Sequence, residues 1–271
     1  MRSVRYTLRD AERWASFSGD HNPIHFDAAE ARRLGMDGLC VHGMRVLLDM
    51  KSVLSQALEK HTLLSGGLLF SSRLRDPVLC AIPYQLSSSE THRGERVQVS
   101  GKLVNTYTMQ NSINGKLSEA NPLALSPVTH VNTLRGDVLA ALYHQFRAVE
   151  PGPVPLWSFF DAVLFRQLVN ATETLETAQG LIPGLKATCL GEVFSQVQVV
   201  QTHHQTHFSP GLFQTAGNAL QGDAIHYAIQ PTLVTGEKTA GLVLVTAIQA
   251  WRINEPLMAV TVTLKTGPLA E

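Results

Sequence analysis

Near its amino end the chain reads Ser18-Gly19-Asp20-His21-Asn22-Pro23-Ile24-His25-Phe26-Asp27. Pro23 fixes its own φ and pushes the residue before it toward extended geometry, so it stiffens a loop that carries a carboxylate and an imidazole five residues apart. Such a loop can direct Asp20 and His25 at one small molecule. Because the unperturbed pKa of histidine lies near neutrality, the pair suits general acid and base catalysis.

A second segment, Val41-His42-Gly43-Met44, opens a run in which apolar residues repeat at intervals of three and four. This spacing predicts a long, largely buried helix over residues 41–58. The backbone N–H of Gly43 would then lack an intrahelical acceptor and lie at the positive end of the helix dipole. We expect this N–H to polarise a carbonyl group, and the missing Cβ to let an acyl chain approach the backbone.

Together the two segments resemble the Asp-x4-His signature and the His-Gly-Met helix start of the MaoC-like (R)-specific enoyl-CoA hydratases and 3-hydroxyacyl-thioester dehydratases, mainly over residues 14–48. The resemblance implies a hot-dog fold and a hydro-lyase of fatty-acid or polyketide-type metabolism, acting on acyl-CoA or acyl carrier protein thioesters without a cofactor. It implies catalytic roles for Asp20, His25 and Gly43. We expect Asn22 and His42 to contact substrate, and we expect no metal.

The chain departs from the family pattern in two places. Lys51 stands where the family often has a serine, and Arg45 follows Met44 where an apolar residue would be usual. No second Asp-x4-His sequence occurs in the carboxyl-terminal half. We therefore expect one active site per chain.

The pattern of elements predicts an α+β protein in which a long helix and an antiparallel sheet occur twice, a double (tandem) hot-dog. In the first half we expect helices at 8–17, 27–35 and 41–58, strands at 68–74, 84–88, 96–104 and 138–149, and a long loop or lid at 106–133. In the second we expect a helix at 156–177 and strands at 193–202, 224–229, 241–253 and 257–265. The Pro/Gly-rich segment 150–155 suggests a boundary between domains 1–150 and 151–271.

Composition narrows the possible partners. The 271 residues include 22 acidic and 22 basic side chains, without the dense basic cluster that nucleic acid binding needs. The start lacks the apolar core of a signal peptide, and the longest apolar run, near 242–250, is too short to span a bilayer. We expect a cytoplasmic protein that binds neither nucleic acid nor membrane. The two hot-dogs of one chain would form a pseudo-dimer, and a homodimer of two chains is one further possibility.

Two alternative functions stay open at this level. An acyl-thioesterase would place a carboxylate on the central helix, where Asp49 and Glu59 are the candidates. A non-catalytic acyl-thioester binding or scaffold protein is favoured by Lys51 and by the degenerate second half. A metal site is a further possibility at three closely spaced histidines, His203, His204 and His207. Their segment is predicted to be a strand, and no carboxylate or cysteine ligand lies near it in the sequence.

Overall fold

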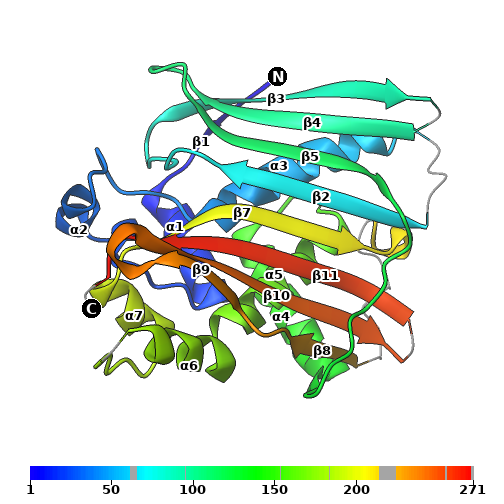
Figure 1. Ribbon diagram of the computed structural model, residues 1–271. Coiled ribbons are helices and arrows are strands. Elements are labelled where there is room, and N and C mark those ends of the chain that lie inside the picture. Colours follow the sequence, from blue (N-terminus) through cyan, green and yellow to red (C-terminus); the bar gives the residue numbers. More distant parts are fainter. Residues whose placement is uncertain are drawn as a thin grey trace.

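A computed structural model of the chain describes residues 1–61, 66–94, 96–152, 154–182, 184–213, 224–253 and 255–269. The strands of this part of the chain form one continuous sheet in the order β1-β3-β4-β5-β2-β7-β11-β10-β8-β6, with β9 paired to β10. The helices cover one face of the sheet (Figure 1).

The elements of the first half lie between residues 2 and 120. They are β1 (Arg2–Arg5), α1 (Leu8–Ser18), the 3-10 turn η1 (Pro23–His25), α2 (Ala28–Arg33), α3 (Gly43–Leu58), β2 (Gly67–Leu74), β3 (Pro83–Arg93), β4 (Arg96–Asn105) and β5 (Asn111–Ala120). Helix α1 begins at a capping box of Thr7 and Asp10 and ends at Gly19, whose φ of 79° favours glycine. This ending starts the loop that carries Asp20.

The second half repeats the arrangement. Its elements are β6 (Asn132–Leu134), α4 (Gly136–Val149), α5 (Leu156–Val169), α6 (Thr172–Leu181), α7 (Leu190–Gln196), β7 (Val199–Phe208), β8 (Ile225–Ile229), β9 (Leu233–Glu237), β10 (Gly241–Arg252) and β11 (Glu255–Thr266). Antiparallel pairing of β2 with β7 joins the two halves into one sheet. The expectation of a long helix against an antiparallel sheet, occurring twice, is confirmed.

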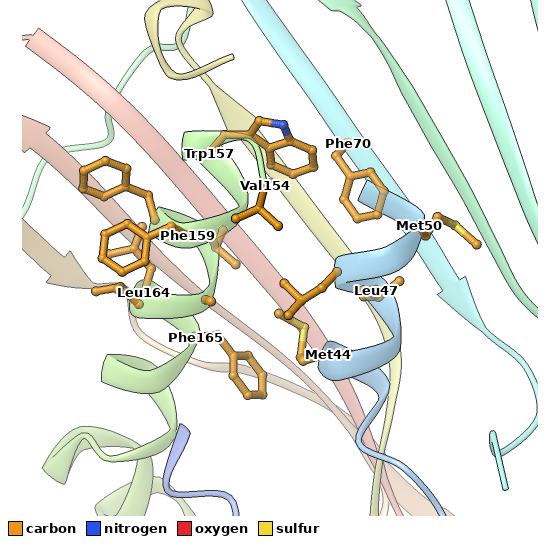
Figure 2. Packing of buried hydrophobic residues seen from close by; sticks show 14 of the residues in the cluster. Met44, Leu47, Met50, Phe70, Val154, Trp157, Phe159, Leu164 and Phe165 are labelled. Atoms are coloured by element: carbon orange, nitrogen blue, oxygen red, sulfur yellow. The ribbon is translucent and has the colours of Figure 1, made fainter. Parts of the chain in front are cut away.

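The core lies where α3 and α5 meet above this junction. Figure 2 shows Met44 and Leu47 of α3 directed toward α5, which presents Trp157 and Phe165. Trp157 stacks on Phe208 of β7 with ring centroids 4.6 Å apart. Since α5 is buried on nearly every side, its apolar residues do not form a single stripe.

Several expected elements are corrected. Residues 138–149 form helix α4 rather than a strand, because Leu139, Leu142, Phe146 and Val149 share one buried helical face. Strand β5 lies inside the expected loop 106–133. The expected helix 156–177 is two helices that break at Asn170 and Ala171. The expected strand 193–202 overlaps helix α7 at residues 193–196, and strand β7 begins only at Val199.

The proposed domain boundary at 150/151 lies between α4 and α5. Strand β6 and helix α4 precede that boundary, although β6 pairs with β8 and α4 packs against both α1 and α5. None of the helices in the described part of the chain combines the length and apolar character that a membrane crossing requires.

Candidate active site

The loop from Asp20 to His25 is held by its own side chains. The carboxylate of Asp20 accepts a hydrogen bond from the Asn22 N–H at 3.2 Å, and the Asn22 side chain accepts one from the Ile24 N–H at 3.3 Å. Asn22 thereby caps η1, in which Pro23 takes the first position and its missing N–H costs nothing. Asn22 is buried and lines the cavity described below, and the bond it makes braces the loop.

His25 presents one ring nitrogen for chemistry. Its Nδ1 lies 2.9 Å from the carbonyl oxygen of Cys40, an acceptor, so Nδ1 carries the proton and donates. Burial lowers the pKa of the imidazole, which keeps it neutral near pH 7. The unprotonated Nε2 is therefore free to accept a proton.

His42 connects the loop to the start of α3. Its Nε2–H donates to the Asp20 carbonyl oxygen at 2.9 Å, and its ring stacks on that of His25 with centroids 3.5 Å apart. Burial, and next the neighbouring His25, lower the pKa of His42 to about 3. His42 lines the cavity, but its visible contacts position Asp20 and His25.

Gly43 is the first residue of α3, so its N–H has no acceptor within the helix. The structure also shows which neighbour a side chain at position 43 would meet, which the sequence alone does not reveal. A Cβ at this position would overlap Cδ2 of Leu74 on β2. An alanine here would therefore displace Leu74, which itself lines the cavity.

A cavity of about 320 Å³ brings these groups together and is built by both halves. Asp20, Asn22, His25, His42 and Gly43 all line it. The opposite wall comes from α5, α6, α7, β7, β10 and β11 and is mostly apolar, including Phe165, Leu181, Phe194, Leu244, Val262 and Leu264. The exposed lining residues 75–77 mark where it meets the surface.

Residues 2–110 match the family of the MaoC-like domain. This part of the chain is a MaoC-like domain of the hot-dog family. Over nearly its full length the protein is also similar to a putative MaoC domain dehydratase from Chloroflexus aurantiacus (10% identity, TM-score 0.53, 100% of this chain and 94% of that chain). A protein described as a MaoC-like dehydratase gives 11% identity and a TM-score of 0.51, with 99% and 96% covered.

The double hot-dog protein Rv0216 of Mycobacterium tuberculosis is similar too, at 10% identity and a TM-score of 0.51, with 98% of this chain and 94% of that chain covered. At these identities the likeness shows the fold, and the fold is a double hot-dog. No curated protein sequence matches the chain significantly.

The MaoC-like domain has one group of residues, within the described ranges, that could hold a metal ion. Ligand atoms of Asp20, His25 and His42 lie within 4.8 Å of one another. The two imidazoles are stacked at an interplanar angle of 28°, so their in-plane lone pairs run side by side instead of converging on one point. Each ring donates a hydrogen bond through one nitrogen, which leaves the other nitrogen of each ring unprotonated. The stacking of the two rings favours acid and base chemistry over a metal centre.

The carboxylates required by the thioesterase alternative do not lie at the cavity. Asp49 is 7% exposed and pairs with Arg45, and it also accepts a hydrogen bond from the Tyr6 hydroxyl at 3.1 Å. Glu59 is exposed and lies past the far end of α3. Neither residue lines the cavity. The same pairing explains how the unusual Arg45 is accommodated in a buried position.

Sequence reasoning missed the polar groups that the second half brings to α3. Lys51 forms a buried ion pair with Asp161 of α5, a residue 110 positions away. Gln201 of β7 lines the cavity and was given no role. The inward position of these groups follows from strand register and helix packing, which a single sequence does not display.

Proposed function

We propose that this protein catalyses the reversible addition of water to trans-2-enoyl thioesters, forming (R)-3-hydroxyacyl thioesters. The observation that carries the proposal is the neutral His25, whose Nε2 is free, beside Asp20 and the start of α3 in a cavity lined mostly by apolar residues. The MaoC-like domain assignment supports the same reaction class. The (R) configuration of the product is taken from the family resemblance. The choice of coenzyme A or acyl carrier protein as the thioester carrier has the same basis.

In the proposed mechanism a water molecule lies between Asp20 and His25. Asp20 accepts a hydrogen bond from one O–H, and Nε2 of His25 removes the proton of the other as the oxygen bonds to C3 of the substrate. The negative charge that develops on the thioester oxygen is stabilised by the Gly43 N–H. The imidazolium then returns its proton to C2, so the elements of one water are added.

The cavity supports a thioester with an apolar acyl chain. The polar groups stand at one side, and the second half supplies the apolar wall. Arg75 is exposed where the cavity meets the surface, a suitable position to meet the phosphates of coenzyme A or an acidic carrier protein. We propose one active site per chain, with the two halves as a pseudo-dimer.

The test is hydration of crotonyl-CoA and of a longer trans-2-enoyl-CoA, followed at the enoyl-thioester absorbance. We expect turnover by the wild type and a loss of about 10²-fold or more in Asp20→Asn and His25→Ala. His21→Ala and Asp37→Asn, on exposed residues nearby, serve as matched controls and keep wild-type rates. Circular dichroism and thermal unfolding establish that each variant folds.

The outcomes separate the candidate functions. Turnover that survives in both active-site variants contradicts the mechanism. Without wild-type turnover on either coenzyme A ester, the corresponding acyl carrier protein thioesters are tested. Failure on both carriers, with thioester binding retained, favours the scaffold alternative.

A further inference from the structure

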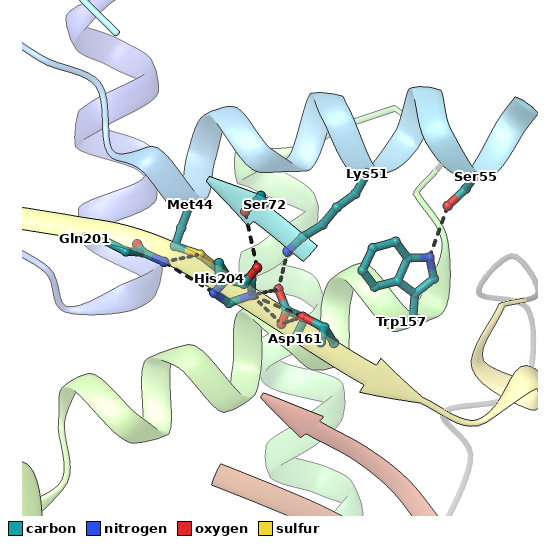
Figure 3. A network of polar contacts seen from close by, with 9 residues as sticks. Met44, Lys51, Ser55, Ser72, Trp157, Asp161, Gln201 and His204 are labelled. Carbon is teal, nitrogen blue, oxygen red and sulfur yellow. Dashed lines mark hydrogen bonds and ion pairs between the residues drawn. The ribbon is translucent and has the colours of Figure 1, made fainter. Parts of the chain in front are cut away.

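A fully buried ion network lies between the two halves. Lys51 of α3 donates to Asp161 of α5, which also accepts hydrogen bonds from Nε2–H of His204 at 2.8 Å and from the Thr206 hydroxyl at 2.6 Å (Figure 3). Lys51, Asp161 and His204 are 0%, 0% and 1% exposed. Because buried charges are costly unless paired, Lys51 and Asp161 stabilise each other's charged form.

The network dictates how the neighbouring Gln201 is oriented. His204 faces a carboxylate through Nε2, so that nitrogen carries the proton, and burial lowers the pKa of His204 and keeps the ring neutral. Nδ1 is then an acceptor. The amide nitrogen of Gln201 lies 3.3 Å from it and donates, which leaves the amide oxygen, Oε1, without a donor among the described residues.

A β-bulge turns Gln201 toward the inside. Thr263 of β11 pairs with His203 of β7, but the next residue, Leu264, pairs with Gln201, so Thr202 is an extra residue. Side chains alternate across a strand, and one inserted residue reverses the alternation. Gln201 therefore faces the same side as His204, and it lines the cavity together with Leu264.

Gln201 also lies close to the groups expected to hold the thioester. Its Nε2 is 3.7 Å from the sulfur of Met44, the residue next to Gly43. We infer that Gln201 is a substrate-contacting residue contributed by the second half, and that its Oε1 accepts a hydrogen bond from a donor group on the thioester. The donor is an amide N–H of the pantetheine arm or a hydroxyl of the acyl group.

This inference rests on the proposed function for the class of ligand, so its test measures binding and needs no turnover. The parent is the Asp20→Asn variant, which prevents conversion of the ligand. Gln201→Met keeps the length of the side chain and removes the acceptor oxygen, together with the N–H that Gln201 donates to His204. Gln205→Met makes the same change on the exposed face of β7 and is the matched control.

Dissociation constants for hexanoyl-CoA and (R)-3-hydroxyhexanoyl-CoA are measured by calorimetry. We expect Gln201→Met to weaken binding by roughly three- to tenfold, the usual effect of one lost hydrogen bond. Equal weakening of both esters identifies the pantetheine amide as the donor. Weakening of the hydroxy ester alone identifies the acyl hydroxyl.

The inference is overturned if Gln201→Met and Gln205→Met both bind the two esters like the parent, or if the parent binds neither ester. If Gln201→Met does not fold, Gln201→Leu replaces it. One further outcome separates the two proposals. If the wild type hydrates no enoyl thioester but Gln201→Met still binds the esters more weakly than the parent, the proposed function is refuted and the role of Gln201 is retained.

Discussion

The reactivity of His25 depends on which ring nitrogen carries the proton. The Cys40 carbonyl holds the proton on Nδ1, and burial lowers the pKa of the ring below its ordinary 6.5. The base is active when neutral, so the rate falls only when acid protonates Nε2. We expect kcat/KM for enoyl-CoA hydration to be level from about pH 7 to 8 and to fall on acidification, with a midpoint below 6.5. A midpoint above pH 7 would contradict His25 as the base.

Gly43 and Leu74 are a coupled pair of positions. In Gly43→Ala the new Cβ would overlap Cδ2 of Leu74, so either Leu74 or the first turn of α3 must shift. Because the clashing atom is the end of a flexible side chain, we expect little loss of stability. We expect hydration by Gly43→Ala to fall at least about tenfold, because the displaced Leu74 lines the cavity. Leu74→Ala removes the clashing atoms. The double variant should regain activity relative to Gly43→Ala, and purely additive losses would argue against this cause.

At the scale of elements, the contact of α3 with α5 depends on the Lys51–Asp161 pair. Although burial raises the pKa of the Asp161 carboxyl, contacts with His204 and Lys51 outweigh it and hold that pKa well below its usual range. Lys51→Met leaves the carboxylate without its cation, and we expect a loss of about 3–5 kcal/mol in urea unfolding. In Lys51→Met/Asp161→Asn the charge is gone. The double variant should lose less than the sum of the single variants, and additivity would contradict the coupling.

The elements that the sequence predicted correctly are those with strong local signals. Helix α3 has a continuous apolar repeat. The loop between Asp20 and His25 has Pro23, which favours the turn η1. Strand β5 was missed because its outer face is polar, although Ile113 and Leu117 alternate inward. In α4 the apolar residues recur at helical spacing, although the sequence predicts a strand at 138–149.

The parts of the site that a single sequence does not reveal depend on distant contacts. Asp20, His25 and Gly43 lie within 24 residues, and the structure gathers them around one cavity. The partner of Lys51 is 110 residues away. The inward direction of Gln201 depends on an extra residue in β7, which is defined only by pairing with β11.

At the scale of the whole molecule, both halves build the candidate active site. The first half carries the groups proposed for catalysis, and the second half closes the cavity with α6, α7 and the inner face of its sheet. Because β2 and β7 join the sheets into one, the two walls of the cavity are fixed relative to each other. A second catalytic loop is therefore not needed to explain why the second half is present.

The burial of neutral histidines makes the stability of the whole fold sensitive to acid. Burial lowers the folded-state pKa of His42 from 6.5 to about 3, and it also lowers the pKa of His25 and of His204. Below pH 6.5 the unfolded chain binds protons that the folded chain cannot bind. Stability is therefore fully present above that pH and is lost progressively as the pH falls toward the folded-state values.

For His42 alone, the shift from 6.5 to about 3 corresponds to a loss of about 2 kcal/mol between pH 7.5 and pH 5. Urea unfolding of the wild type at these two pH values should show at least this decrease. His42→Gln, which keeps a donor for the Asp20 carbonyl, should lose about 2 kcal/mol less on acidification. The exposed His144 provides the control, because His144→Gln should follow the wild type. An equal decrease in all three proteins would mean that His42 is not held neutral by the fold.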